Sequence, residues 1–295
     1  MKLIQISDFK KGLSINGFYV CNEKQIRHAK NGDLYLDMIF SDSTGVISAK
    51  LWNMVDQFQE KFQNGDAVAV KGSITEYNDH LQLTVLHINK ATSKQYAKYG
   101  FSNMLLIKAV SEPIEKLWKQ LERFMHELND PHRQLIRIIF KKYEEKIKII
   151  PAFIGNHNSI RGGFLKNLVT IAEMAIKILP HYPQLDKNLV LSGIFIHDIG
   201  KVESFNDALK VDYTNAGKLV GPMVIGLEIL RKSATLVNDF PEELLLRLEH
   251  IVSLNEEIKI SDSLDKAKFP EVVFIKCVYS MNFQMDVILE SINKY

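Results

Sequence analysis

The chain has 295 residues, of which 46% are hydrophobic and 24% are charged, and its formal net charge at pH 7 is +2. This composition is ordinary for a globular protein, and the length suits two domains. So small a net charge excludes a protein that binds nucleic acid through an overall basic field, so any such binding must come from a local patch.

The cysteines and the polarity of the chain indicate its compartment. Cys21 and Cys277 lie far apart in the sequence, which favours free thiols in a reducing compartment over a disulfide. The polar start at Met1–Gln5 is unlike a signal peptide. No stretch has the uninterrupted apolar length expected of a membrane span. We therefore expect a cytoplasmic, soluble protein without a membrane partner.

Residues 12–90 show the apolar alternation of half-buried strands. In the clearest run, Leu34, Leu36, Met38 and Phe40 alternate with Asp33, Tyr35, Asp37 and Ile39. Similar runs follow at 47–52, 68–70 and 81–85, and turn residues such as Asn64-Gly65 separate them. Five short strands in this length favour a closed barrel over an open sheet, because closure removes the edges. The predicted fold of this part is a five-stranded OB-fold barrel.

One face of the predicted barrel carries aromatic and basic side chains. Tyr19, Tyr35, Lys50 and Trp52 fall on the polar phase of their strands. Such a face can stack the bases and hold the phosphates of single-stranded RNA or DNA. Tyr19 and Trp52 can equally pack beneath the helical part of the chain, since aromatic residues are also common at protein interfaces. The local charge does not separate these interpretations, because acidic and basic residues nearly balance over residues 1–95.

After Pro113 the hydrophobic period becomes helical, and helices are predicted through to residue 292. We divide the chain into an OB-fold domain over 1–92, a helical connector over 93–150 and an all-α domain over 151–295. The connector ends in a basic run, made up of Lys141, Lys142, Lys146 and Lys148. This run is most simply a solvated helix face, and a strip facing phosphates is the less favoured interpretation.

An almost wholly apolar helix over 189–196 ends at His197 and Asp198. An imidazole nitrogen and a carboxylate oxygen on adjacent residues can both reach a cation at a helix end. Lys201, one turn beyond Asp198, can meet a phosphate as a point charge. Polar groups this close to a core need partners. The alternative is a capped helix end with a hydrogen-bonded histidine and no catalytic role.

Four segments carry a resemblance to a known family: 45–53 in the barrel, 130–143 in the middle helices, 157–163 before the next helix, and the His197-Asp198 helix end. In their order and spacing the chain resembles the YhaM family of 3′-to-5′ exoribonucleases. The resemblance implies an OB-fold followed by an HD-like phosphohydrolase domain over 151–295. It implies that Asp198 and Lys201 are catalytic, and that His157 and Arg161 contact the nucleic acid.

The resemblance also implies a set of metal ligands that the chain keeps only in part. His197 and Asp198 match, but other residues replace the remaining ligands, namely Asn167, Pro222, Asn255-Glu256 and Tyr279. A weak site for one Mn²⁺ or Mg²⁺ can be built from His197, Asp198, Glu256 and the carbonyl oxygen of Asn167. We favour a degenerate site, because the ligands that remain are too few for a closed catalytic centre.

Three functions follow from these observations. The favoured one is a single-stranded nucleic-acid-binding protein, a pseudoenzyme or nearly so, with weak or lost phosphodiesterase activity. The second is an active metal-dependent 3′-to-5′ exoribonuclease that uses the altered ligand set. The third is a structural or regulatory homo-oligomer. Other catalytic schemes lack a motif, because the chain has no P-loop, no Cys-x-x-Cys pair and no Gly-x-Ser-x-Gly elbow.

Overall fold

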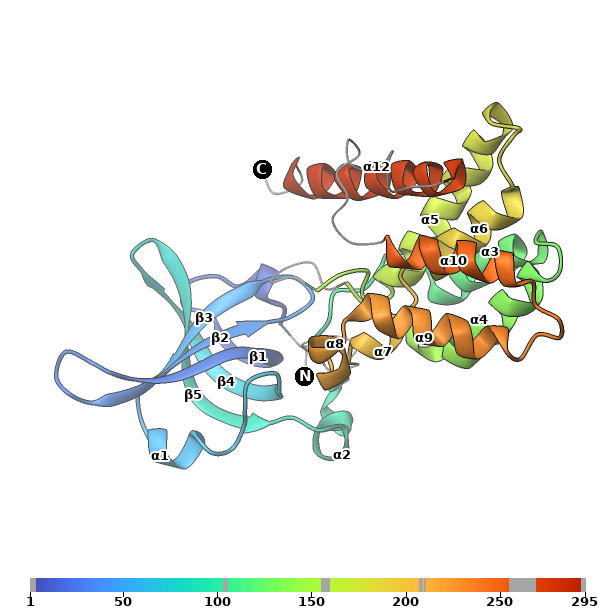
Figure 1. The fold of residues 1–295 in the computed structure, drawn as a ribbon. Coiled ribbons are helices and arrows are strands. Elements are labelled where there is room, and N and C mark those ends of the chain that lie inside the picture. Colours follow the sequence, from blue (N-terminus) through green and yellow to red (C-terminus); the bar gives the residue numbers. More distant parts are fainter. Residues whose placement is uncertain are drawn as a thin grey trace. The chain divides into compact units, whose positions relative to one another are not determined.

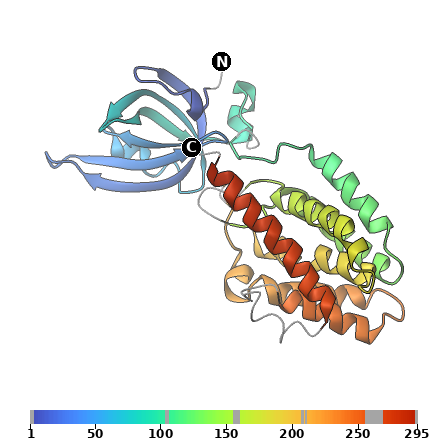
Figure 2. The same cartoon turned by 90° about the horizontal axis from the view of Figure 1, so that it is seen from above.

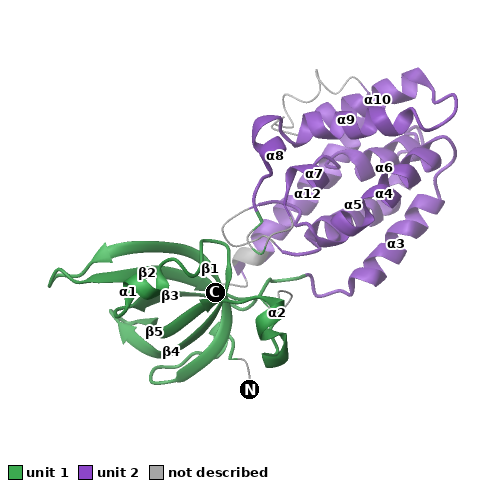
Figure 3. Ribbon diagram, turned by 90° about the horizontal axis from the view of Figure 1, so that it is seen from below, with its two compact units in different colours: residues 1–109, 208–211 green, residues 110–207, 212–295 purple. Residues whose placement is uncertain are grey.

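The structure is a computed structural model that describes residues 4–102, 106–154, 160–206, 209, 211–254 and 269–292. The chain forms two compact units (Figure 3). Unit 1 comprises residues 1–109 and 208–211, and unit 2 comprises residues 110–207 and 212–295. The strands lie in unit 1 and the long helices in unit 2.

Unit 1 contains a closed barrel (Figure 1). Its five strands are β1 (Ser14–His28), β2 (Leu34–Ser41), β3 (Val46–Leu51), β4 (Ala67–Tyr77) and β5 (His80–Lys90). They close in the order β1-β2-β3-β5-β4, and β3 and β5 form the one parallel pair. The short helix α1 (Val55–Phe58) connects β3 to β4. The predicted five-stranded OB-fold barrel is therefore confirmed.

The barrel core follows the predicted alternation on β2, where Leu36, Met38 and Phe40 point inward and are at most 1% exposed. The outward placement predicted for Tyr19 is wrong. Tyr19 is fully buried in the core, where its ring stacks on Phe40 with centroids 6.4 Å apart. Its hydroxyl donates a hydrogen bond to the carbonyl oxygen of Ile4 at 3.1 Å.

The reason for this error lies on the opposite side of β1. Phe18 is also buried, in a second cluster outside the barrel core, where its ring lies 5.0 Å from that of Phe101. A strand that is covered on both faces shows no alternation from which its phase can be read.

Unit 2 is built from helices, and its described residues contain no strand. The long helices are α3 (Ile114–His126), α4 (His132–Ile149), α5 (Gly163–Ile178), α6 (Lys187–Ile196), α9 (Pro222–Ala234), α10 (Glu242–Ser253) and α12 (Pro270–Ile292). Shorter ones are α7 (Lys201–Ser204) and α8 (Asn215–Leu219), while α2 (Ser93–Tyr96) lies in unit 1. Helix α6, which is buried from Leu189 to Ile196, packs against α5, α10 and α12 (Figure 2). The predicted all-helical region is confirmed.

A close backbone contact fixes the turn after α6. A Cβ atom on Gly200 would lie 1.8 Å from the carbonyl oxygen of Pro222 and 2.7 Å from the backbone nitrogen of Gly226. Both separations are far below van der Waals contact, so α9 can approach this turn only where the residue is glycine. The contact holds the start of α9 beside the segment that carries His197 and Asp198.

Helix α12 is predominantly apolar, but only its first half is well buried. Val272, Ile275 and Val278 are buried, whereas Met285 and Ile288 are 53% and 55% exposed. By length and composition alone, Pro270–Leu289 could cross a membrane, with a mean hydropathy of 1.4 and 28% of the window buried. The sequence expectation that no stretch reaches this length is thus too strong, although a core helix of a soluble protein passes the same test.

Candidate functional site

The first candidate site lies at the end of α6. The side chain of Asp186 caps the helix by accepting hydrogen bonds from the backbone N–H groups of Asn188 and Leu189. Every residue from Leu189 to Ile196 is buried, so the helix carries its last polar residues into the interior of unit 2. His197 and Asp198 are accordingly each 5% exposed, as the apolar run before them predicted.

His197, Asp198 and Lys201 form a compact cluster. His197 Nδ1 lies 2.7 Å from the carbonyl oxygen of Ile194, so this nitrogen carries the proton and donates. The other ring nitrogen, Nε2, lies 3.6 Å from Asp198 Oδ2. Lys201 Nζ donates to the same Oδ2 at 2.6 Å and to the carbonyl oxygen of Ala152 at 2.8 Å. The carboxylate and the ammonium thus neutralise each other inside the fold.

Burial and the charge of Asp198 together set the protonation of the groups around this carboxylate. It lowers the pKa of His197, an effect that outweighs the opposing influence of the Asp198 charge. Burial works against the Lys201 ammonium too, but Asp198 overcomes it and the pKa of Lys201 is raised. At neutral pH the cluster therefore holds a neutral imidazole, a carboxylate and an ammonium.

Helix α12 supplies two further side chains to this region. The Tyr279 ring meets the His197 ring edge-on, with centroids 5.0 Å apart. Burial and the charge of Asp198 raise the pKa of Tyr279, so it remains a neutral phenol. One turn later, Asn282 Nδ2 donates to Asn167 Oδ1 at 2.7 Å. Asn282 is 7% exposed and was not identified from the sequence, although its i+3 spacing from Tyr279 places both on one face of α12.

The structure thus brings together most of the positions at which the resemblance implies metal ligands. Tyr279 contacts His197, Asn282 ties Asn167 to the same helix, and Pro222 packs on the turn after Asp198. Glu256 and its neighbour Asn255 lie outside the described residues, so the predicted role of Glu256 as a ligand stays a prediction. The same holds for His157 as a nucleic-acid contact.

The described residues of this cluster do not fit a divalent cation well. No group of three or more His, Cys, Asp or Glu side chains comes together in the part of the chain that the structure describes. Asp198 already forms an ion pair with an ammonium group, and the oxygen of Asn167 already accepts a hydrogen bond from Asn282. A cation here would meet the positive charge of Lys201 at close range, which is unfavourable in a buried site.

The second candidate site is the outer face of β2 and β3. Tyr35 on β2 and Trp52, directly after β3, stack with ring centroids 4.6 Å apart and an interplanar angle of 27°. Lys50 Nζ lies over both rings, 5.0 Å from the Tyr35 centroid and 5.5 Å from the Trp52 centroid. Trp52 is 43% exposed, and Tyr35 and Lys50 are half-buried. The structure therefore brings these three predicted residues together on the surface of unit 1.

Two charged residues, Asp37 and Arg27, lie beside this face. Asp37 lies opposite Lys50 in the β2–β3 pairing, and Arg27 forms an ion pair with Asp37 at 3.1 Å. An exposed aromatic pair with a cation above it can stack bases and attract phosphate.

Arg161, predicted to contact nucleic acid, belongs to unit 2, where its carbonyl oxygen accepts a hydrogen bond from the backbone nitrogen of Val110 at 3.1 Å.

Comparison with known proteins supports both the barrel and the wider resemblance. Residues 22–91 match the family model described as an OB-fold nucleic acid binding domain. The 3′-5′ exoribonuclease YhaM of Shouchella clausii is 28% identical, with 84% of this chain and 76% of that protein aligned. The resemblance to the YhaM exoribonucleases is confirmed.

A second YhaM, from Halalkalibacterium halodurans, is 26% identical, with 83% of this chain and 75% of that protein aligned. Among solved structures, the second OB-fold domain of replication protein A from Methanococcus maripaludis is 23% identical and gives a TM-score of 0.26. That match covers 30% of this chain and 94% of the other. The two YhaM alignments extend far beyond the barrel and therefore include much of unit 2.

Proposed function

We propose that this chain is a single-stranded nucleic-acid-binding protein related to the YhaM exoribonucleases, in which metal-dependent hydrolysis is weak or lost. The observation that carries the binding half is the Tyr35–Trp52 stack with Lys50 above it. Every base has a π-face, so an exposed aromatic pair binds single strands with little sequence preference. The nucleic-acid-binding description of the matched family agrees with this proposal.

The loss of hydrolysis is supported by the cluster around Asp198. A metal-dependent phosphodiesterase needs a cation that polarises a phosphoryl oxygen and activates water. Here the Asp198 carboxylate is neutralised by Lys201, and the neutral residues Asn167 and Tyr279 stand where the resemblance implies further ligands. On this proposal residues 151–295 keep the arrangement of an HD-like phosphohydrolase domain without its full ligand set, and residues 93–150 connect that domain to the barrel. We place the protein in the cytoplasm.

The binding proposal is tested by Trp52→Ala. Stacking contributes about 1–3 kcal/mol per base, so affinity for a labelled single-stranded RNA should fall roughly tenfold or more in a fluorescence-anisotropy titration. The matched control is Tyr77→Ala, which removes an aromatic side chain that is 64% exposed at the end of β4. Equal binding by the wild type and a folded Trp52→Ala variant would contradict the proposal.

An active exoribonuclease with an altered ligand set is the second candidate, favoured by the convergence of Asn167, Tyr279 and His197 in unit 2. A trimming assay with 5′-labelled RNA and Mn²⁺ separates the two functions. We expect no progressive shortening from the 3′ end. Shortening that is abolished by both Asp198→Asn and Glu256→Gln would establish the second candidate instead, and metal content measured without chelator would then reach one equivalent.

A further inference from the structure

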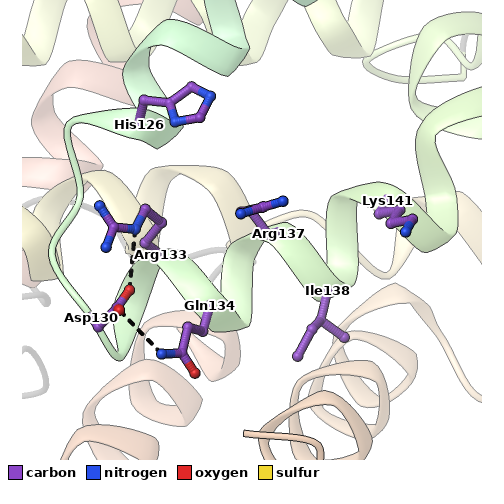
Figure 4. Close-up of a pocket in the computed structure, with 7 residues that line it drawn as sticks. All are labelled: His126, Asp130, Arg133, Gln134, Arg137, Ile138 and Lys141. Carbon is purple, nitrogen blue, oxygen red and sulfur yellow. Dashed lines mark hydrogen bonds and ion pairs between the residues drawn. The ribbon is translucent and has the colours of Figure 1, made fainter.

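The exposed face of α4 carries a row of cations beside a shallow hollow (Figure 4). The hollow measures about 670 Å³ and lies between the last turn of α3 and the outer face of α4. Arg133, Arg137 and Lys141 follow one another along α4, and His126 faces them from the end of α3 (Figure 4). Positions four residues apart share a helix face and are separated by about 6 Å along the axis, so the three charges form a continuous strip.

The charges in this hollow are unbalanced. Asp130 is its one acidic lining residue, against three permanent cations. The carboxylate of Asp130 accepts hydrogen bonds from Gln134 Nε2 and Arg133 Nε, both at 3.1 Å, which lower the pKa of Asp130. Among the described residues, no carboxylate lies within ion-pair distance of Arg137 or Lys141.

Several other cations of unit 2 are paired with carboxylates. Lys148 pairs with Glu115 and Glu144, Lys177 with Glu173, Lys187 with Glu127, and Arg231 with Glu249. In each of these pairs the two opposite charges largely cancel, so the pair attracts a charged ligand only weakly. The strip on α4 differs because it presents two exposed cations and the remaining guanidinium nitrogens of Arg133 to one hollow.

We propose that the α4 strip, defined as Arg133, Arg137 and Lys141, is a second nucleic-acid contact that binds backbone phosphates. Guanidinium groups match the geometry of phosphate oxygens, and the ammonium of Lys141 adds a point charge. Among the described residues, no Phe, Tyr or Trp side chain lines the hollow, so this contact binds mainly the backbone and is independent of sequence. The inference rests on the proposed function, since it assigns to unit 2 a further contact with single-stranded nucleic acid.

The test compares two charge-neutralising double variants of the full-length protein. R137A/K141A removes two cations of the strip, and K116A/K119A removes two exposed cations of α3 that do not line the hollow. Binding of a fluorescent single-stranded RNA is measured between about 50 and 200 mM salt. For single strands, each phosphate contact contributes about 0.7 to the slope of the logarithm of the binding constant against the logarithm of the salt concentration. Loss of two contacts in R137A/K141A should therefore flatten this slope by about 1.4 and weaken binding several-fold at low salt. The control should change affinity by less than about twofold.

A charge-retaining variant and the barrel variant make the outcome specific. R137K/K141R should keep the wild-type slope, and Trp52→Ala should weaken binding at all salt concentrations with the slope nearly unchanged. An unchanged slope in R137A/K141A, or an equal loss in K116A/K119A, would overturn the inference while Trp52→Ala still supports the proposed function. A wild-type protein that binds no single strand would overturn both.

Discussion

The barrel face and the Asp198 cluster use similar side chains in opposite ways. On the barrel, Lys50 lies over two rings at the surface, and the 43% exposed Trp52 leaves one of them open to a ligand. In unit 2, Lys201 is turned inward onto Asp198, whose side chain is 4% exposed. A cation above an exposed ring can still act on something outside the protein. A cation in a buried pair is already neutralised, and its contribution is confined to the fold.

The comparison predicts that the largest effect follows from breaking the buried pair. Asp198→Ala leaves the ammonium of Lys201 buried without its counter-charge, which should lower the free energy of unfolding by about 3–5 kcal/mol in urea denaturation. Adding Lys201→Met should restore part of this loss. The control is Asp212→Ala, which removes an exposed partner of Lys218, and should change stability by less than about 1 kcal/mol. An Asp198→Ala protein as stable as the wild type would show that the pair is not buried as described.

Acid should weaken unit 2 through its buried histidines. Burial lowers the pKa of both His197 and His132, whose Nδ1 lies 2.8 Å from Ser192 Oγ. Below pH about 6.5 the unfolded chain therefore takes up protons that the folded chain does not, so stability falls as the pH falls. The slope should approach about 1.4 kcal/mol per pH unit for each histidine.

This pH effect is measured as the free energy of urea unfolding from pH 7 down to pH 5. His197→Gln should reduce the slope, whereas His181→Gln, at an exposed position, should leave it unchanged. A stability that stays level over this range, or an identical slope in both variants, would contradict the assignment of neutral buried imidazoles.

The smallest expected effect concerns Lys50, the half-buried cation of the barrel face. Lys50→Gln removes the charge above Tyr35 and Trp52, an interaction of about 0.5–1 kcal/mol at an exposed site, and one phosphate contact. Affinity for single-stranded RNA should fall about three- to fivefold, and the salt slope should flatten by about 0.7. Lys71→Gln, at an exposed position on β4, is the control. If the two variants lost affinity equally, Lys50 would contribute only through the net charge of the protein and not through its position over the rings.

The sequence predicted a side chain's position correctly where its strand is buried on one face and exposed to solvent on the other. The alternation of β2 placed Tyr35 on the outer face correctly, because only the other face of this strand, with Leu36, Met38 and Phe40, is buried. Tyr19 was misplaced because β1 is covered on both sides at that point. The meeting of Tyr279 with His197 was suggested only by the resemblance, and Asn282 was missed. Both depend on how α12 packs against α5 and α6, which no local pattern encodes.

The two cysteines give the native protein one convenient chemical handle. Cys21 is buried in the barrel, whereas Cys277 is exposed on α12, two residues before Tyr279. A maleimide dye should therefore attach at a single position without any engineered substitution, since only an accessible thiolate reacts readily. The fluorescence spectrum of the dye would report on helix α12, which contacts His197 and Asn167. The rate at which Cys21 becomes reactive would measure the rate at which the barrel unfolds.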